Sequence, residues 1–236
     1  MLSDVEAAEL HALLEEQDFQ DRILPAVLKG DGARPAPLYW LQECTKSYDE
    51  KWVAHGFDGP YQPFANLPYF PWLFRILQTK DRLLIPKSRE MMVSWCVIGY
   101  GVWLCQTRPR TRVIVQTQKE GKAIDLIKGA GVPGYGRTLY DQQGERLKQE
   151  FPLTKPMEDQ PGDAISWRNG SILQGVPSGA DQVRLYHPTV IIWDEAAHLE
   201  DLEGSWSAGE PVAQQMIAVS SVAPGAFWDW VRPPGL

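Results

Sequence analysis

Two adjacent carboxylates, Asp194 and Glu195, directly follow a run of four apolar residues in the sequence. The apolar run predicts a strand buried on both faces, and ligands of open α/β sheets bind beyond the carboxyl ends of such strands. Asp194 would there hold Mg²⁺ through its water shell, and Glu195 would orient and deprotonate an attacking water. The alternative interpretation is that Asp194 and Glu195 cap the N-terminus of a helix that begins at Ala196.

A second group of candidate residues lies between a short apolar segment and a long apolar helix. A phosphate-binding loop in this position reads G-x-x-x-x-G-K-[ST], and its hydroxyl binds Mg²⁺. Ser94 occupies the hydroxyl position, whereas Lys87 and Met92 replace the glycines and Val93 replaces the lysine. Lys87 and Arg89 could supply the missing cation, or they could be solvated turn charges before a core helix. The predicted nucleotide-binding segment is Lys87, Ser88, Arg89, Glu90, Met91, Met92, Val93, Ser94 and Trp95.

Two further hydroxyls, Ser220 and Ser221, follow the apolar segment 216–219. If that segment is a neighbouring strand, both serines lie at the same sheet edge as the acid pair. A polar residue in this position can sense the terminal phosphate or position water. A plain turn is the alternative interpretation.

The elements that must position these residues follow an alternating pattern. We expect strands at 82–86, 112–116, 189–193 and 215–219 and helices at 93–106 and 119–128. A hairpin is expected at 164–168 and 171–176, because Asn169-Gly170 is a strong signal for a two-residue turn. Alternation of strands and helices predicts an α/β fold with a mostly parallel sheet flanked by helices.

The segment before this pattern has a different composition. Ser3 and Glu6 form a possible capping box, and the helix after it would carry Leu10, Leu13 and Leu14 on one face. Residues 31–71 are rich in Pro and aromatic residues, which predicts irregular packing around a core. We therefore expect an extension at 1–60, a nucleotide-binding domain at 61–231 and the start of a linker at 232–236.

Composition excludes several classes of protein. The net charge is −7, which argues against nucleic-acid binding over the whole surface, and 22% charged residues argue against wholesale disorder. The apolar run at 91–105 is too short to span a membrane. Residues 1–21 hold seven acids and no Lys or Arg, unlike a secretory signal. Three cysteines without C-x-x-C spacing and four histidines without H-x-x-x-H spacing give little support to a metal centre built from them.

Together, these motifs resemble the large terminase subunit of tailed bacteriophages over about residues 83–230. The resemblance is carried by Lys-Ser-Arg-x-x-x-x-Ser-Trp, by Trp-Asp-Glu-Ala-Ala and by Val-Ser-Ser-x-Ala-Pro-Gly-x-Phe. It implies a P-loop NTPase fold of the ASCE type, with ATP and Mg²⁺ as cofactors. Two departures are Met92 in place of a glycine and the lack of the family's adenine-contacting glutamine in 67–72. A terminase also has a C-terminal nuclease domain, which this chain does not reach.

The resemblance also implies a role for each candidate residue. Lys87 and Glu195 would be catalytic, Ser94 and Asp194 would hold the metal, and the family's coupling motif would include Ser220 and Ser221. Arg184 would complete the ATP site of a neighbouring subunit, or it could form a structural ion pair with Asp181.

The function implied is ATP-driven translocation of double-stranded DNA into a procapsid. The expected partners are duplex DNA, the portal protein, the small terminase subunit and further copies in a ring, in the cytoplasm of the infected host and transiently docked on the procapsid. Residues 75–128 hold eleven basic and four acidic residues, a local charge of +7 that would suit a phosphate-facing surface or a solvated helix face. The alternatives are a helicase-like remodelling NTPase and a docking module that binds nucleotide or DNA without hydrolysis.

Overall fold

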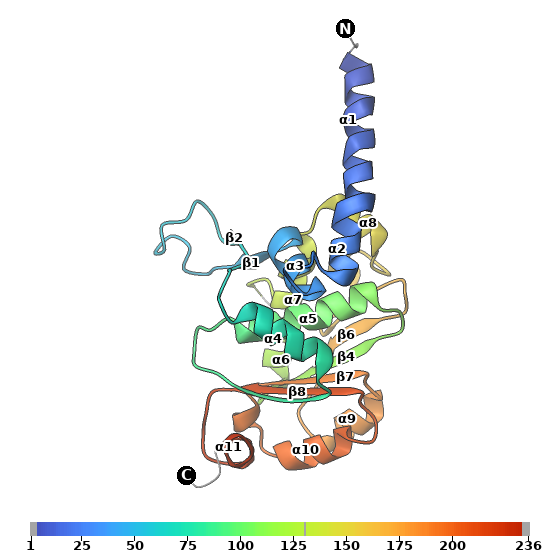
Figure 1. The fold of residues 1–236 in the computed structure, drawn as a ribbon. Coiled ribbons are helices and arrows are strands. Elements are labelled where there is room, and N and C mark those ends of the chain that lie inside the picture. Colours follow the sequence, from blue (N-terminus) through green and yellow to red (C-terminus); the bar gives the residue numbers. More distant parts are fainter. Residues whose placement is uncertain (1–3, 130, 233–236) are drawn as a thin grey trace.

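The computed structural model describes residues 4–129 and 131–232, and a six-stranded sheet lies at its centre (Figure 1). The strand order is β3-β8-β7-β4-β6-β5. The first five strands in this order run parallel, and β5 runs antiparallel to β6. The strands are β3 (Arg82–Pro86), β4 (Arg112–Gln116), β5 (Ala164–Ser166), β6 (Ile172–Gly175), β7 (Val190–Asp194) and β8 (Gln215–Ser220). The α/β fold predicted from the alternating pattern is therefore confirmed.

Alternate residues of each central strand contribute to two separate apolar cores. Ile192 and Ile217 belong to the core beneath α4 (Phe70–Thr79) and α5 (Val93–Thr107). Ile191, Trp193 and Met216 belong to the core beneath α9 (Ala180–Tyr186), α10 (Leu202–Gly209) and α11 (Ala226–Val231). This follows from the two-residue period of a strand. Because both faces are covered, β7 and β8 are buried along their whole length, and so is the backbone that leads to Asp194.

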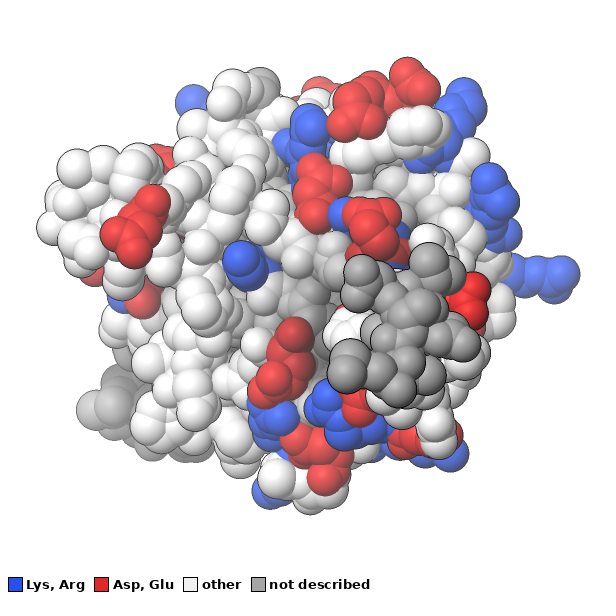
Figure 2. Space-filling view, turned by 90° about the horizontal axis from the view of Figure 1, so that it is seen from above, with Lys and Arg blue, Asp and Glu red and all other residues white. Residues whose placement is uncertain are grey.

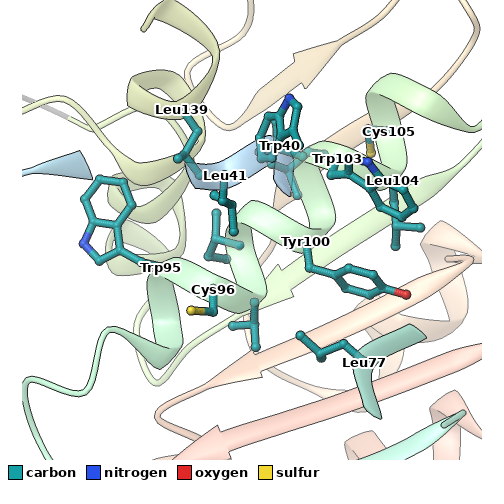
Figure 3. Close-up of a cluster of buried hydrophobic side chains, with 14 of the residues drawn as sticks. Trp40, Leu41, Leu77, Trp95, Cys96, Tyr100, Trp103, Leu104, Cys105 and Leu139 are labelled. Carbon is teal, nitrogen blue, oxygen red and sulfur yellow. The ribbon is translucent and has the colours of Figure 1, made fainter. Parts of the chain in front are cut away.

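The helices cover both faces of the sheet (Figure 1). The central one, α5, follows the β3 loop and buries most of its length, so that Trp95, Cys96, Tyr100 and Trp103 pack with residues of α3, α4 and α7 (Figure 3). The helices are α1 (Asp4–Asp18), α2 (Leu24–Lys29), α3 (Ala36–Cys44), α4 (Phe70–Thr79), α5 (Val93–Thr107), α6 (Glu120–Ile127), α7 (Tyr135–Asp141), α8 (Glu145–Glu150), α9 (Ala180–Tyr186), α10 (Leu202–Gly209) and α11 (Ala226–Val231), with the short turns η1 (Phe19–Ile23), η2 (Met157–Asp159) and η3 (Ala196–His198).

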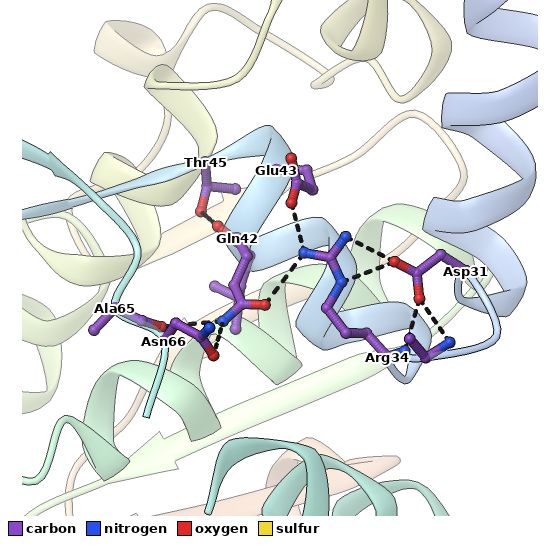
Figure 4. A network of polar contacts seen from close by, with 9 residues as sticks. Asp31, Arg34, Gln42, Glu43, Thr45, Ala65 and Asn66 are labelled. Atoms are coloured by element: carbon purple, nitrogen blue, oxygen red, sulfur yellow. Dashed lines mark hydrogen bonds and ion pairs between the residues drawn. The ribbon is translucent and has the colours of Figure 1, made fainter. Parts of the chain in front are cut away.

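The N-terminal extension packs onto the α5 side of the core. The indole Nε1 of Trp103 donates to the carbonyl of Val27 at 2.8 Å. Arg34 joins Asp31 to Glu43, and the Gln42 side chain donates to the Ala65 carbonyl at 3.2 Å (Figure 4). A small hairpin of β1 (Lys46–Tyr48) and β2 (Tyr61–Pro63) crosses the expected boundary at residue 60. That boundary stays a prediction.

The helix expected near the N-terminus is present, but it projects from the body (Figure 1). Leu10, Leu13 and Leu14 are exposed, so the predicted apolar face covers no core in the part of the chain that the structure describes. Ser3, the expected cap, lies outside the described residues, as do 233–236 of the expected linker. Among the described residues, no helix combines the length and apolar character needed to cross a membrane.

The hairpin predicted at Asn169-Gly170 is present with a different turn. Trp167 and Ser171 close it, since the Trp167 N–H donates to the Ser171 carbonyl and the Gly170 N–H donates to the Trp167 carbonyl. Gly170 has a φ of +86°, a value that suits glycine. The loop thus holds three residues, in the form of a turn followed by a left-handed residue, and the expectation of two was wrong.

Candidate nucleotide and metal site

The two half-motifs meet through one hydrogen bond. The Ser94 hydroxyl, in the first turn of α5, donates to Oδ1 of Asp194 at 2.8 Å. The two residues are a hundred positions apart in the chain and come together because β3 and β7 run parallel, with β8 between them. A serine hydroxyl and a carboxylate are two of the hard oxygen ligands that Mg²⁺ prefers, so the donor set fits this ion.

Asp194 is only 6% exposed, and its surroundings affect its charge in opposite directions. Burial raises the pKa of the carboxyl above its usual value, while the bond from Ser94 and the charge of Lys87 act to lower that pKa. A buried carboxylate with few compensating contacts favours a cation beside it. The influence of Lys87 also indicates that its ammonium lies within electrostatic range of Asp194.

The segment between β3 and α5 has an irregular backbone. Glu90 and Met92 have φ values of 61° and 52°, in the left-handed region that favours glycine. Met92 stands at one of the two positions where the standard loop has glycine. The backbone there keeps the left-handed conformation that suits glycine, although the residue is methionine. The Tyr69 hydroxyl donates to the Met91 carbonyl, and the Ser88 N–H lies 3.3 Å from the Met91 sulfur. The first contact ties the middle of the loop to the residue before α4, and the second lies within the loop.

Ser220 connects the loop to the acid strand. Its carbonyl accepts from the Lys87 N–H at 2.9 Å, and its hydroxyl accepts from the Ala197 N–H at 3.1 Å. Ser220 is fully buried at the end of β8, between the two strands that carry the half-motifs. Ser221 is half-buried just beyond it. Ser220 is thus bonded to both sides of the site.

Glu195 leaves the strand in another direction from Asp194. Its φ is 55°, and its Oε2 lies 3.0 Å from the Lys122 ammonium on α6. Both side chains are about half exposed, so water screens their attraction and the pair contributes little to stability. Glu195 is bonded to a neighbour and still reachable by water.

Aromatic residues lie beside the acid pair. Trp95, next to Ser94, stacks on Tyr135 with ring centroids 3.9 Å apart. Burial raises the pKa of the Tyr135 hydroxyl, and the charges of Asp194 and Glu195 raise it further. Tyr135 therefore stays neutral and lies within electrostatic range of both carboxylates.

Other predicted residues do not join this cluster in the structure. Ser88, Arg89 and Glu90 are exposed. Arg184 lies on α9, where its guanidinium pairs with Asp181 at 3.0 Å, and both side chains are largely exposed. Its neighbour Tyr186 accepts a bond from Arg112, the first residue of β4, so Arg184 lies toward the opposite edge of the sheet.

The basic residues of 75–128 do not form one surface. Lys87, Arg89, Lys119 and Lys122 follow the carboxyl ends of β3 and β4, whereas Arg82, Arg108, Arg110 and Arg112 lie at the opposite edge. Lys128 is buried and donates to the Gln160 carbonyl at 2.8 Å. On the face seen along α1, acidic and basic residues are mixed (Figure 2).

Three contacts of the site were missed in the sequence. Lys122, Tyr69 and Tyr135 each reach the cluster from an element distant in the chain, and none has a motif of its own. Lys122 does stand in the first turn of α6, six residues after the end of β4, on the side where the carboxyl ends of parallel strands meet. That position was a usable signal.

The chain is similar to known proteins at the level of solved structures. No family model and no curated protein sequence matches the chain. The large terminase of bacteriophage HK97 is similar in structure, with a TM-score of 0.51 and 11% identity over 78% of this chain and 36% of that one. The large terminase ATPase domain of Thermus phage P74-26 aligns with a TM-score of 0.44 and 17% identity, over 78% of this chain and 74% of that one. The sheet and its covering helices thus have the fold of the part of the HK97 large terminase with which they align.

Proposed function

We propose that this chain is a Mg²⁺-dependent ATP hydrolase. The observation that carries the proposal is the 2.8 Å bond between Ser94 and Asp194, which joins the loop hydroxyl to the strand carboxylate. A P-loop ATPase binds Mg²⁺ through such a pair, and the ion neutralises charge on the β- and γ-phosphates.

The remaining residues of the cluster suit complementary roles. Lys87 would place its ammonium near the phosphate oxygens, in compensation for the apolar Val93. Glu195 would accept a proton from the attacking water, because its carboxylate is half exposed and adjacent to the metal-binding Asp194. Ser220 is hydrogen-bonded to Lys87 of the loop and to Ala197 of the turn after Glu195. It would therefore transmit a movement of the phosphate-binding loop to the turn that carries Glu195, or the reverse.

We further propose that hydrolysis drives translocation of duplex DNA into a viral procapsid. The motif resemblance supports this proposal, and it implies a ring of copies that works with a portal protein and a small terminase subunit in the host cytoplasm. Arg184 would then act on the neighbour's nucleotide, since it lies toward the edge away from its own site and is exposed.

The test is a steady-state phosphate-release assay on the purified chain, with Mg²⁺ and with and without duplex DNA. We expect turnover that needs Mg²⁺, is abolished by EDTA and is lost in Asp194→Asn. Turnover that persists in Asp194→Asn would exclude this site as its source. Stimulation by DNA would support the motor role over a DNA-independent ATPase.

A non-hydrolysing nucleotide- or DNA-docking module is the second candidate. Val93 and Met92 favour it, since they remove the usual lysine and a glycine from the loop. The paired Ser94 and Asp194 and the accessible Glu195 favour hydrolysis. Nucleotide binding without phosphate release in the same assay would support the docking module. A helicase-like NTPase would instead separate strands of a forked duplex.

A further inference from the structure

A polar cleft of about 360 Å³ lies at the sheet edge opposite to Ser94 and Asp194. It forms where α4 and α5 end and where β4, β7 and β8 begin. Arg108 and Arg110 line one side, Gln214 and Asp81 line another, and Tyr100 is part of the wall. The site described above uses none of these residues.

The inner wall of the cleft is firmly built. Gln215 is 9% exposed, and its amide donates to the carbonyls of Leu77 at 2.6 Å and Lys80 at 2.7 Å. Tyr100 is 3% exposed and extends from α5 above Leu77, with its hydroxyl on the side away from Trp95 (Figure 3). Burial raises the pKa of that hydroxyl, so it stays protonated and can donate. The cleft is therefore held in shape before any ligand arrives.

Two guanidinium groups stand at the rim with Pro109 between them. Both arginines are exposed, and neither forms an ion pair with any residue that the structure describes. Arg108 lies 5.5 Å from the centre of the Trp103 ring, and Arg110 has a φ of 57°. A left-handed backbone is uncommon at residues other than glycine and is found more often at binding sites than elsewhere.

The charge of the rim contrasts with that of the whole chain. Asp81 is the one acid that lines the cleft, in a protein with a net charge of −7. The nearby Arg82 does not line the cleft, but it donates to the carbonyls of Gln214 and Ala213 and so supports the wall. Guanidinium groups are suited to the oxygens of a phosphate, because each presents several N–H donors in one plane.

We propose that this cleft binds a phosphate group through Arg108 and Arg110, at a site separate from the proposed nucleotide site. The phosphate is either a diester in the backbone of duplex DNA or free inorganic phosphate. The DNA source rests on the proposed function, whereas phosphate binding itself does not.

The test compares Arg108→Gln/Arg110→Gln with the control Lys29→Gln/Lys155→Gln in the full chain. Glutamine keeps the packing of the arginine stems, and both double variants remove two positive charges. The control lysines are exposed, lie on other elements and do not line the cleft. Binding of a fluorescent 20-base-pair duplex is measured by anisotropy over a range of salt, and binding of inorganic phosphate by calorimetry. Thermal melting checks that each variant is folded.

If DNA is the source, the arginine variant should bind the duplex about tenfold more weakly. The slope of its binding constant against salt concentration, on logarithmic axes, should fall by the release of about two counterions. If free phosphate is the source, phosphate binding alone should be lost. An equal effect of the control variant, or unchanged binding of both ligands, would overturn the proposal. Phosphate release from ATP is measured on all three proteins without DNA. Its absence in the unmodified chain would contradict the proposed function and leave the binding result intact.

Discussion

The two edges of the central sheet differ in chemistry. At the carboxyl edge, Ser94, Asp194 and Ser220 are buried or half-buried and bonded to one another or to adjacent backbone. At the opposite edge, Arg108, Arg110 and Arg184 are exposed. The carboxyl edge holds a cluster of hydrogen-bonded side-chain oxygens, and the opposite edge holds arginine side chains that are exposed to solvent. Under the two proposals above, the chain binds its own nucleotide at the first edge and offers the second to phosphates of other molecules.

The largest expected effect concerns Arg184. If it completes a neighbour's ATP site, Arg184→Ala should reduce turnover about a thousandfold under conditions where rings form. Asp181→Ala is the matched control, because it breaks the ion pair of Arg184 and keeps the arginine. That variant should hydrolyse ATP within about twofold of the unmodified chain if the pair is only a surface contact.

Mixing experiments sharpen this prediction. Arg184→Ala and Glu195→Gln subunits should each be inactive alone, and rings that contain both should recover part of the activity. Mixed rings that form and stay inactive would contradict action between subunits. Substantial turnover by Arg184→Ala alone would assign the residue a purely structural role.

The next effect belongs to the carboxyl edge. Glu195→Gln should reduce phosphate release by about a hundredfold or more and leave binding of Mg²⁺–ATP unchanged, because the amide cannot accept the proton from water. Glu200→Gln, at an exposed position nearby, is the control. Near-normal turnover by Glu195→Gln would remove this residue from the mechanism.

A smaller loss is expected in the loop. Lys87→Ala should reduce turnover by about tenfold or more, since its ammonium would replace that of the absent loop lysine. Ser88→Ala, next to it and exposed, should have almost no effect. If titration with ATP and turnover are both unchanged in Lys87→Ala, Arg89 becomes the candidate for this cation.

The smallest expected effect is a gain in the thermal stability of Asp194→Asn, in contrast to the losses of activity predicted above. Burial raises the pKa of Asp194 in the folded chain, so keeping it ionised costs stability as pH rises above its usual value of 3.8. Asp194→Asn should therefore melt at a higher temperature at pH 7, by about 2–4 °C for each kcal/mol gained. The difference should shrink toward pH 4, where the unmodified carboxyl becomes protonated. If Asp194→Asn melts at a lower temperature than the unmodified chain at pH 7, the contacts of the Asp194 carboxylate outweigh the cost of burying its charge.

Local patterns predicted the strands and the motifs well. The bounds of β3 and β4 match the expected strands, and β7 begins and ends one residue later than expected. These segments are continuous apolar runs that the sheet buries on both faces, so their sequence reports their structure directly. The order of the two half-motifs on their elements was also visible, because each lies at the end of such a run.

Features that depend on distant contacts could not be predicted. The Glu195–Lys122 pair and the Tyr69–Met91 bond join elements that only the folded sheet brings together. The charge count of 75–128 gave no warning that its basic residues divide between two edges, because charge along a chain does not specify direction in space. The exposed leucines of α1 show the same limit, since periodicity indicates a face and not what covers it.

The most direct test of the account is binding of Mn²⁺, as a substitute for Mg²⁺, in the presence of ATP, followed by electron paramagnetic resonance. We expect one bound ion for each chain that requires ATP, and its loss in both Ser94→Ala and Asp194→Asn. Ser88→Ala, six residues earlier and in the loop before α5, should bind the ion normally. Undiminished Mn²⁺ binding in both Ser94→Ala and Asp194→Asn would contradict the claim that this pair forms the metal site.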